Sequence, residues 1–146
     1  MKKPIGQSMV EARLITKDQL EDLLEYQKRQ REKVIFGKLS LELGLISEDQ
    51  FAPFIASYFD VPFINLKDHP IIVRREAINM IPESIARRLN VLPLTKDNNT
   101  LTVAVSDPLD LVALDNLAIV SHCNVKPVVS TPSQITHSIT ISYGIL

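Results

Sequence analysis

The sequence has little glycine, one cysteine and no tryptophan. Its four glycines cannot be arranged into the glycine-rich phosphate-binding loops of ATPases or dinucleotide-dependent enzymes. The single cysteine, Cys123, excludes a disulfide framework and a cysteine-based zinc site within one chain. It falls in an apolar stretch that we expect to be helical, where a small buried side chain is typical. We therefore expect no catalytic residues and no enzymatic activity in this chain.

The charge balance and the hydrophobic runs exclude two further classes of protein. The formal net charge is -1, which is not the electrostatic profile of a nucleic-acid-binding chain. No apolar run approaches the ~18 residues of a membrane span, and the N-terminal MKKPIGQSMV lacks the apolar core of a signal peptide. We expect a globular protein of a reducing, cytosolic compartment, without nucleic-acid partners or direct membrane insertion.

Side chains that bind metals are present but scattered. The three histidines are far apart in the sequence and none has a Glu-x-x-His arrangement. Asp107, Asp110 and Asp115 supply oxygen ligands in one short segment. A helix cap, a first-turn acid and a helix-surface acid explain the same three residues. We expect no metal site.

An internal repeat is the most informative feature. Ile5–Leu20, IGQSMVEARLITKDQL, aligns with Phe36–Phe51, FGKLSLELGLISEDQF, at an offset of 31 residues, 37 minus 6. The identical pairs are Gly6/Gly37, Glu11/Glu42, Leu14/Leu45, Ile15/Ile46, Asp18/Asp49 and Gln19/Gln50. Each copy predicts a short helix, a turn, a Ser/Thr-x-x-Gln capping box and a second helix.

The two copies differ at the turn. Gly44 occupies the position where a left-handed residue ends a helix, and the first copy has Arg13 there. Because arginine loses about 1 kcal/mol in that conformation, we expect the first turn to be strained or differently built. Pro53 predicts a kink or a later start of the second copy's second helix. The helix that follows Thr16 is expected to continue through Lys33.

Beyond Tyr58 the pattern changes to short strands. Val61–Leu66 predicts an extended segment, and Leu66–Pro70 predicts a linker. Residues 71–90 predict one or two short helices, interrupted by Pro82.

A hairpin and a third strand follow. Val91–Leu94 and Leu101–Val105 flank a turn at residues 97–99, and Asn124–Val129 predicts the third strand. Between them, a helix is expected with Asp107 as its cap and Pro108 in its first position. Its apolar positions are Val112, Leu114, Leu117, Val120 and Ser121. A capping box at residues 131–134 opens a last helix through Tyr143, with Ile135, Ile139 and Tyr143 on one face.

The fold class that follows is α+β. Residues 1–60 predict an N-terminal helical subdomain of two helix-turn-helix repeats. Residues 61–146 predict a small helix-covered β-sheet subdomain in the order β-β-α-β-α, with the linker around residues 66–70.

The repeat has the pattern G-x-x-[LM]-V-x-x-x-L-I-x-x-x-x-L-x-x-x-L-x-x-Q, and the blocks VPFINL, INMIPESIARRLNVLPL and LTVAVSDPLDLVALDNL follow it. Together these resemble the N-terminal domain of the type II secretion and type IV pilus assembly ATPases, the general secretion pathway protein E family with its MshEN domain. The resemblance covers essentially the whole chain. The motif positions are Gly6, Met9, Val10, Leu14, Ile15, Leu20, Leu24 and Gln27 in the first copy and Gly37, Leu41, Gly44, Leu45, Ile46, Phe51 and Ile55 in the second.

The resemblance implies a noncatalytic module that precedes a motor ATPase domain in the same chain. It implies a bacterial cytoplasmic location, peripheral to the inner membrane through docking on the cytoplasmic part of a platform protein. A second implication is a cyclic di-GMP site built from the motif positions of both copies. A third alternative is the same domain fused to a signalling protein.

The motif departs from the family pattern where cyclic di-GMP binding needs charge. The family's arginine, two residues before the first glycine, is Pro4 in one copy and Ile35 in the other. Arg13 replaces a glycine, and Tyr58 replaces the closing glutamine. Two lost charge-assisted contacts weaken binding by about 1.5–3 kcal/mol each. We therefore expect a docking scaffold first, with cyclic di-GMP binding as the alternative.

The basic run at residues 28–33 predicts a solvated helix end, where cations suit the negative end of the helix dipole. The alternative is a site for an anion or an acidic partner.

Overall fold

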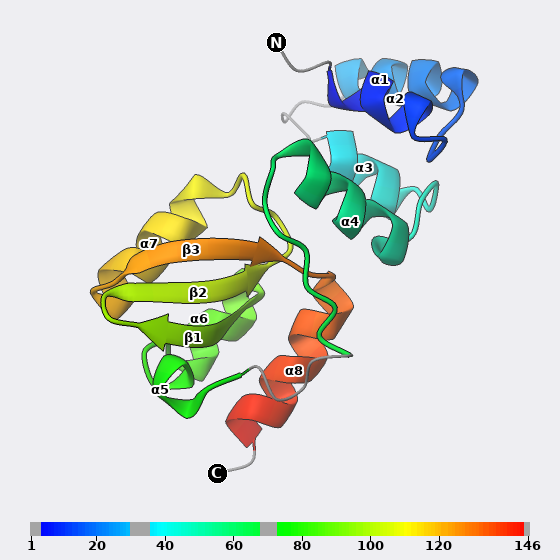
Figure 1. Ribbon diagram of the computed structural model, residues 1–146. Helices are drawn as coiled ribbons and strands as arrows, with labels where there is room; N and C mark the ends of the chain where they lie inside the picture. The colour runs from blue at the N-terminus through cyan, green and yellow to red at the C-terminus, as the bar shows by residue number, and fades with distance from the viewer. Residues whose placement is uncertain (1–3, 30–35, 68–72, 145–146) are drawn as a thin grey trace. The chain divides into compact units, whose positions relative to one another are not determined.

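The computed structural model of the chain describes residues 4–29, 36–67 and 73–144 (Figure 1). Helices fill the first part, and a three-stranded sheet with helices forms the second, so the predicted α+β class is confirmed. The chain divides into two compact units, Met1–Phe54 and Ile55–Leu146. The domain boundary predicted after residue 60 stays a prediction.

The first unit is built from the repeat. Its helices are α1 (Ile5–Glu11), α2 (Lys17–Arg29), α3 (Phe36–Glu42) and α4 (Glu48–Tyr58), the last of which continues into the second unit. Helix α1 contacts both α2 and α3, and α2 contacts α3. Met9 and Leu23 are buried in this unit. Their burial gives a unit of this size its small apolar core.

Both predicted capping boxes are formed. The Thr16 amide donates to Gln19 Oε1 at 2.8 Å, and the Gln19 amide donates to Thr16 Oγ1 at 3.1 Å. The Ser47 amide donates to Gln50 Oε1 at 3.1 Å, and the Gln50 amide donates to Ser47 Oγ at 3.2 Å. These bonds satisfy first-turn amides that have no partner within the helix.

Pro53 does not delay the start of α4. The helix begins at Glu48 and contains Pro53, and the Phe51 amide already donates to the Ser47 carbonyl at 2.9 Å. The prediction of a later start is wrong, because the capping box fixes the first turn before the proline is reached. Helix α2 is described as far as Arg29, so its predicted continuation through Lys33 lies outside the described residues.

The sheet of the second unit has the strand order β1-β2-β3. Strands β1 (Val91–Asp97) and β2 (Thr100–Val105) form the predicted antiparallel hairpin, and β3 (Asn124–Val129) is parallel to β2. The register of the hairpin shifts after Pro93, which has no amide hydrogen to donate to the ladder. The predicted extended segment forms a parallel bridge from Phe63 to Val129.

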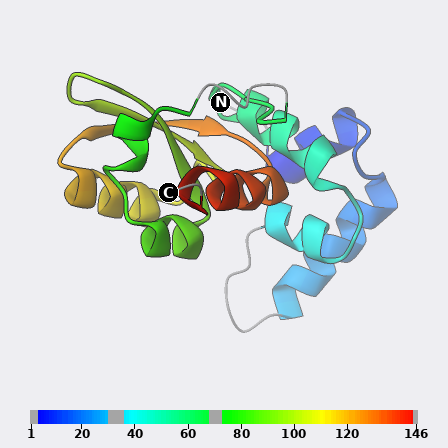
Figure 2. The ribbon, with the colours of Figure 1, turned by 90° about the horizontal axis from the view of Figure 1, so that it is seen from below.

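Helices cover one face of this sheet. They are α6 (Glu83–Leu89), α7 (Leu111–Ser121) and α8 (Pro132–Gly144), with the short α5 (Arg75–Ile78) against β1 (Figure 2). The large side chains that are fully buried in this core are Ile81, Val91, Leu92, Leu94, Leu101, Val103, Leu117, Val129, Ile135 and Ile139. At its edge the Tyr143 hydroxyl donates to the Ile81 carbonyl at 2.8 Å. Burial, with a smaller effect of the Glu83 carboxylate, raises the pKa of Tyr143 to about 12.

The helix between β2 and β3 begins later than predicted. Its cap is Asp110, whose carboxylate accepts from the Ala113 amide at 3.0 Å. Asp107 instead closes a turn by accepting from the Leu109 amide at 2.9 Å. The prediction that Asp107 is the cap is therefore wrong, because two aspartates three residues apart both fit the pattern and only Asp110 has helical amides within reach.

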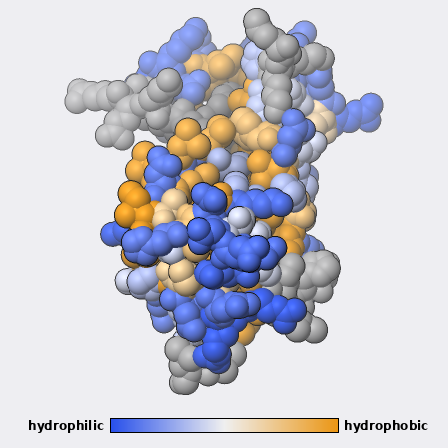
Figure 3. Space-filling model, turned by 60° about the vertical axis from the view of Figure 1, so that its left-hand side comes forward, coloured by the Kyte–Doolittle hydropathy of each residue, from blue (hydrophilic) through white to orange (hydrophobic). Residues whose placement is uncertain are grey.

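The buried face of α7 also differs from the prediction. The residues buried are Ala113, Leu117 and Ser121, whereas Val112 and Val120 are exposed. Hydrophobic side chains thus reach the surface, as Figure 3 shows for one side of the molecule. Cys123 is buried as predicted, but it lies in the turn after α7 and not in a helix.

The capping box of α8 is only half formed. The Gln134 amide donates to Thr131 Oγ1 at 3.2 Å, but Gln134 Oε1 accepts from the Leu66 amide at 2.8 Å and does not bond the Thr131 amide. This long-range bond ties down Leu66, which is buried. Leu66 therefore belongs to the core, contrary to its assignment to a linker, and residues 68–70 lie outside the described residues.

Candidate functional site

The predicted motif residues fall into three groups by exposure. The buried ones are Gly6, Met9, Ile15, Ile46, Phe51 and Ile55. The half-buried ones are Val10, Leu14, Leu20, Gln27, Leu41 and Leu45, and the exposed ones are Leu24 and Gly44. Gly37 lies in α3, and nothing is described of its surroundings. Most of the motif therefore packs helices together, and only part of it is open to a ligand.

The two turns of the repeat have the same hydrogen bonds. In the first, the Arg13 amide donates to the Val10 carbonyl and the Leu14 amide to the Met9 carbonyl, both at 3.0 Å. In the second, the equivalent bonds run from Gly44 to Leu41 at 3.1 Å and from Leu45 to Ser40 at 3.0 Å. This pair of bonds is the Schellman motif, which needs a left-handed residue.

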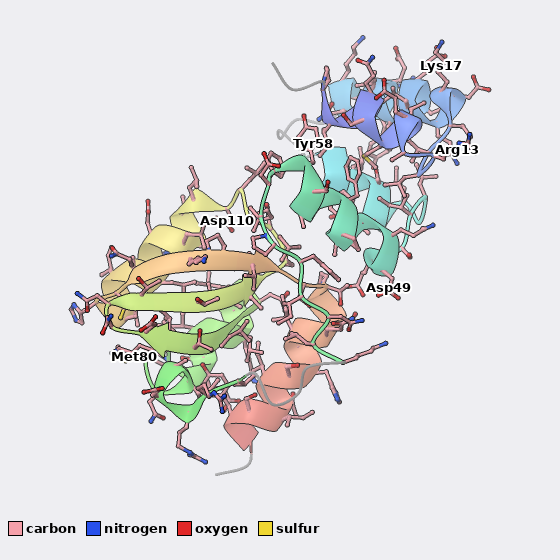
Figure 4. All side chains as sticks on the ribbon, in the orientation of Figure 1. Arg13, Lys17, Asp49, Tyr58, Met80 and Asp110 are labelled. Carbon is pink, nitrogen blue, oxygen red and sulfur yellow. The ribbon has the colours of Figure 1, made fainter. Side chains whose placement is uncertain are left out.

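Arg13 adopts that left-handed conformation. Its φ is 62°, close to the 74° of Gly44. Of the two alternatives for the first turn, a strained turn is therefore correct and a different construction is wrong. Arg13 is exposed in the turn between α1 and α2, where its guanidinium is accessible to solvent (Figure 4).

A small pocket lies where the two copies meet within the first unit. It has a volume of about 200 Å³, and its lining residues are Gln19, Asp22, Leu23, Tyr26, Leu43 and Leu45. Of these, only Leu45 was predicted as a site residue. Tyr26 and Leu43 were missed. Tyr26 is a large side chain in a strongly polar stretch, which is a usable signal, whereas Leu43 lies among other apolar residues and gives none.

This pocket does not suit a cyclic dinucleotide. Its volume is below the ~300–1,000 Å³ that is usual for ligand sites. The exposed Asp22 carboxylate at its wall repels phosphate, because the two groups carry charges of the same sign. A site for such a ligand therefore has to lie elsewhere on the repeat.

The charges of α2 are divided along its length. Asp18 lies in its first turn, and Lys28 and Arg29 lie in its last turn, as the predicted solvated basic helix end requires. Arg29 lies 4.0 Å from Glu25, with both side chains exposed, so this ion pair contributes little to stability. Residues 30–33 of the basic run lie outside the described residues.

Two kinds of feature are absent from the described residues. No three His, Cys, Asp or Glu side chains in the described part of the chain come together as metal ligands do. No described helix combines the length and the hydrophobicity that crossing a bilayer requires.

Comparison with known families identifies the chain. The family model described as the MshEN domain matches residues 59–145. The chain belongs to the MshEN domain family. This match confirms the predicted resemblance and lies entirely within the second unit, whereas the similarities to individual proteins extend through the repeat.

Two pilus proteins are similar over nearly the whole chain. The type IV pilus assembly ATPase PilB of Myxococcus xanthus is 29% identical over 140 residues, which are 96% of this chain and 24% of that protein. PilB of Thermus thermophilus is 27% identical over 146 residues, which are 97% of this chain and 16% of that protein. The bacteriophage adsorption protein B of Escherichia coli K12 is 32% identical over 112 residues, 77% of this chain and 14% of that protein. The chain thus spans about a quarter or less of the length of these relatives.

Solved structures show the same architecture. A structure of MshE with cdg, cyclic di-GMP, has a TM-score of 0.79 and 30% identity, and covers 97% of this chain and 99% of that one. The N-terminal domain of XpsE has a TM-score of 0.75 at 19% identity, covering 95% and 96% of the two chains, and shows the fold alone. The chain is homologous to part of the type IV pilus assembly ATPase PilB and to MshE.

Proposed function

We propose that this chain is a noncatalytic docking and regulatory module at the N-terminus of a type II secretion or type IV pilus assembly ATPase. It binds the cytoplasmic part of the inner-membrane platform on which the motor works, and this contact holds the motor at the membrane. The observation that carries the proposal is the 96% coverage of this chain by a pilus ATPase of which it spans only 24%. The motor functions belong to the remainder of such a protein.

The residues of the chain support a role that does not include catalysis. The four glycines form no phosphate-binding loop. In the described part of the chain, the carboxylates, histidines and cysteine are not gathered into a metal site. The repeat is instead a rigid scaffold, with reciprocal caps and two matching turns. A rigid scaffold with exposed apolar side chains suits protein binding, because little conformational entropy is lost on association.

Co-elution in size-exclusion chromatography tests the docking role. The purified chain is mixed with the cytoplasmic domain of the platform protein encoded beside its parent gene. We expect a stable complex that elutes ahead of either component. Separate elution at tens of micromolar of each protein argues against docking. The parent gene supplies an independent check, since a phosphate-binding loop should follow this domain if a motor is attached, and a different downstream domain would favour the fusion alternative.

A second candidate function is cyclic di-GMP binding. It is favoured by the likeness to MshE, whose structure was solved with that ligand, at 30% identity and a TM-score of 0.79. The motif positions of the two copies, from Gly6 to Gln27 and from Gly37 to Ile55, form the proposed site. Arg13 is the exposed cation nearest the first turn in sequence and would replace the guanidinium that Pro4 and Ile35 do not supply.

Calorimetric titration with cyclic di-GMP, with ATP as the control ligand, tests the second candidate. A receptor gives saturable heat with the dinucleotide alone, and Gly37→Trp, which puts a bulky side chain at a glycine of the motif, abolishes it. Gly144→Trp is the matched control, because a side chain at Gly144 meets no atom within 4 Å. Absence of heat at millimolar ligand would remove this candidate and leave the docking role untouched.

A further inference from the structure

Helix α7 carries an unusual surface for a helix of a small domain. Its outward side chains include Leu111, Val112 and Ile119, which are 65%, 73% and 70% exposed. At 100° per residue these three lie on the side opposite the buried Ala113 and Leu117. Asp115 is exposed and falls between them on the same side. We call Leu111, Val112, Asp115 and Ile119 the α7 face.

Folding of this unit does not explain the α7 face. Single exposed aliphatic residues are ordinary, but a cluster on one helix marks an interaction site. Four other residues of the DPLDLVALDNL block have structural roles. Asp107 closes a turn, Asp110 caps the helix, and Ala113 and Leu117 are buried. In the described part of the chain, Asp115 has no hydrogen-bond or ion-pair partner.

The charges around the α7 face identify its occupant. Residues 97–125 contain four aspartates and no lysine or arginine. On the α7 face itself the charge is the exposed Asp115 carboxylate, which anionic lipid headgroups repel, so an anionic bilayer is disfavoured. A second copy whose two-fold axis passes through the middle of the α7 face would bring Asp115 against its own counterpart, and like charges at a partly desolvated interface are unfavourable. A partner with cationic side chains beside aliphatic ones meets both requirements.

We propose that the α7 face is the docking surface of this module, and that it receives a segment of the platform protein in which aliphatic side chains are flanked by lysine or arginine. The inference rests on the proposed docking function and names its surface and the chemistry of its partner. The aliphatic residues supply the buried contact area, and Asp115 forms a charge-assisted bond with the incoming cation. Figure 3 shows hydrophobic side chains at the surface among polar ones on this side of the molecule.

Dissociation constants for the platform's cytoplasmic domain test the aliphatic part. The wild-type chain is compared with a Val112→Arg, Ile119→Arg double variant, in which two exposed anchors become cations. We expect binding weakened by about tenfold or more, as for hot-spot residues. Ile141→Arg is the matched control, since Ile141 is 46% exposed on α8, away from the α7 face. It should alter the constant by less than about twofold. Thermal unfolding confirms that each variant is folded.

The charge of the partner is tested with Asp115. Asp115→Lys should weaken binding by about tenfold and flatten its dependence on salt, and Asp115→Asn should have a smaller effect in the same direction. A double variant that loses affinity while Asp115→Lys keeps it would contradict a cationic partner.

The outcomes separate this inference from the proposed function. If the wild-type chain binds the platform and every α7 variant binds equally well, the docking function stands and the α7 face is not its surface. If the wild-type chain does not bind, the docking function and this inference fail together. A wild-type dimer that the double variant dissociates would assign the face to a second copy and overturn the proposal.

Discussion

The two copies of the repeat have nearly the same backbone but different chemistry. Both turns contain the same pair of hydrogen bonds and a left-handed residue, at φ 62° and 74°. Both second helices begin with a reciprocal Ser/Thr–Gln cap. Yet the left-handed residue is Arg13 in one copy and Gly44 in the other. The comparison teaches that the hydrogen-bond pattern determines the turn, and that a residue unsuited to it is tolerated at a modest cost in free energy.

The equivalent core positions show the same contrast. Met9 and Ser40 are both fully buried, and Ile15 and Ile46 are both buried. The same positions are thus buried in both copies. One of them has a large apolar side chain, Met9, in the first copy and a small polar one, Ser40, in the second. The two copies are therefore expected to contribute unequally to stability, and three pairs of substitutions at equivalent positions measure the difference.

The largest expected effect comes from the buried pair. Met9→Ala removes a fully buried side chain and should lower the free energy of unfolding by about 2–4 kcal/mol, because the lost contacts leave a cavity. Ser40→Ala removes one hydroxyl and should cost about 1 kcal/mol. Urea denaturation measures both. Equal losses at the two positions would mean that the copies contribute equally to the core.

The capping boxes should have effects of intermediate and equal size. Thr16→Ala and Ser47→Ala each remove one cap, and each should lower the free energy of unfolding by about 1 kcal/mol. Thr16→Ser is the control that keeps the hydroxyl and should retain most of the stability. A loss confined to one copy would show that its cap bonds do not form in solution.

The smallest effects are expected at the turns, and they should have opposite signs. Arg13→Gly removes the backbone strain of an arginine in the left-handed conformation, and it should raise the free energy of unfolding by about 0.5–1 kcal/mol. Gly44→Ala should lower it by about 1 kcal/mol through backbone strain alone, since an added Cβ meets no atom within 4 Å. Chemical denaturation of both variants makes the comparison. A destabilising Arg13→Gly would show that the arginine side chain has a stabilising role of its own.

Much of the fold was predictable because its signals are local. The capping boxes, the hairpin and Gly44 depend on residues a few positions apart. The predictions were wrong where a hydrogen-bond partner is distant in the sequence, or where two residues fit the same role. Gln134 bonds the Leu66 amide, 68 residues away, and no local pattern predicts that choice. Asp107 and Asp110 both fit a cap, and only the path of the chain after β2 selects Asp110.

The candidate surfaces were harder to predict than the fold. The pocket lined by Tyr26 and Leu43 depends on how the two copies pack within the first unit. The exposure of the α7 face was not predicted from the sequence, because an apolar helix between two strands is usually buried by both the sheet and the neighbouring helices. Exposure of Val112, which was expected in the core, became apparent only from the position of α7 against β3.

Calorimetric titration of the chain with the cytoplasmic domain of the platform protein, with and without cyclic di-GMP, tests the central claim most directly. The account predicts saturable binding at one site per chain in the absence of any nucleotide. Binding that appears only when cyclic di-GMP is present would make the chain a ligand-gated receptor first. Absence of heat under both conditions, from folded components, would contradict the docking function.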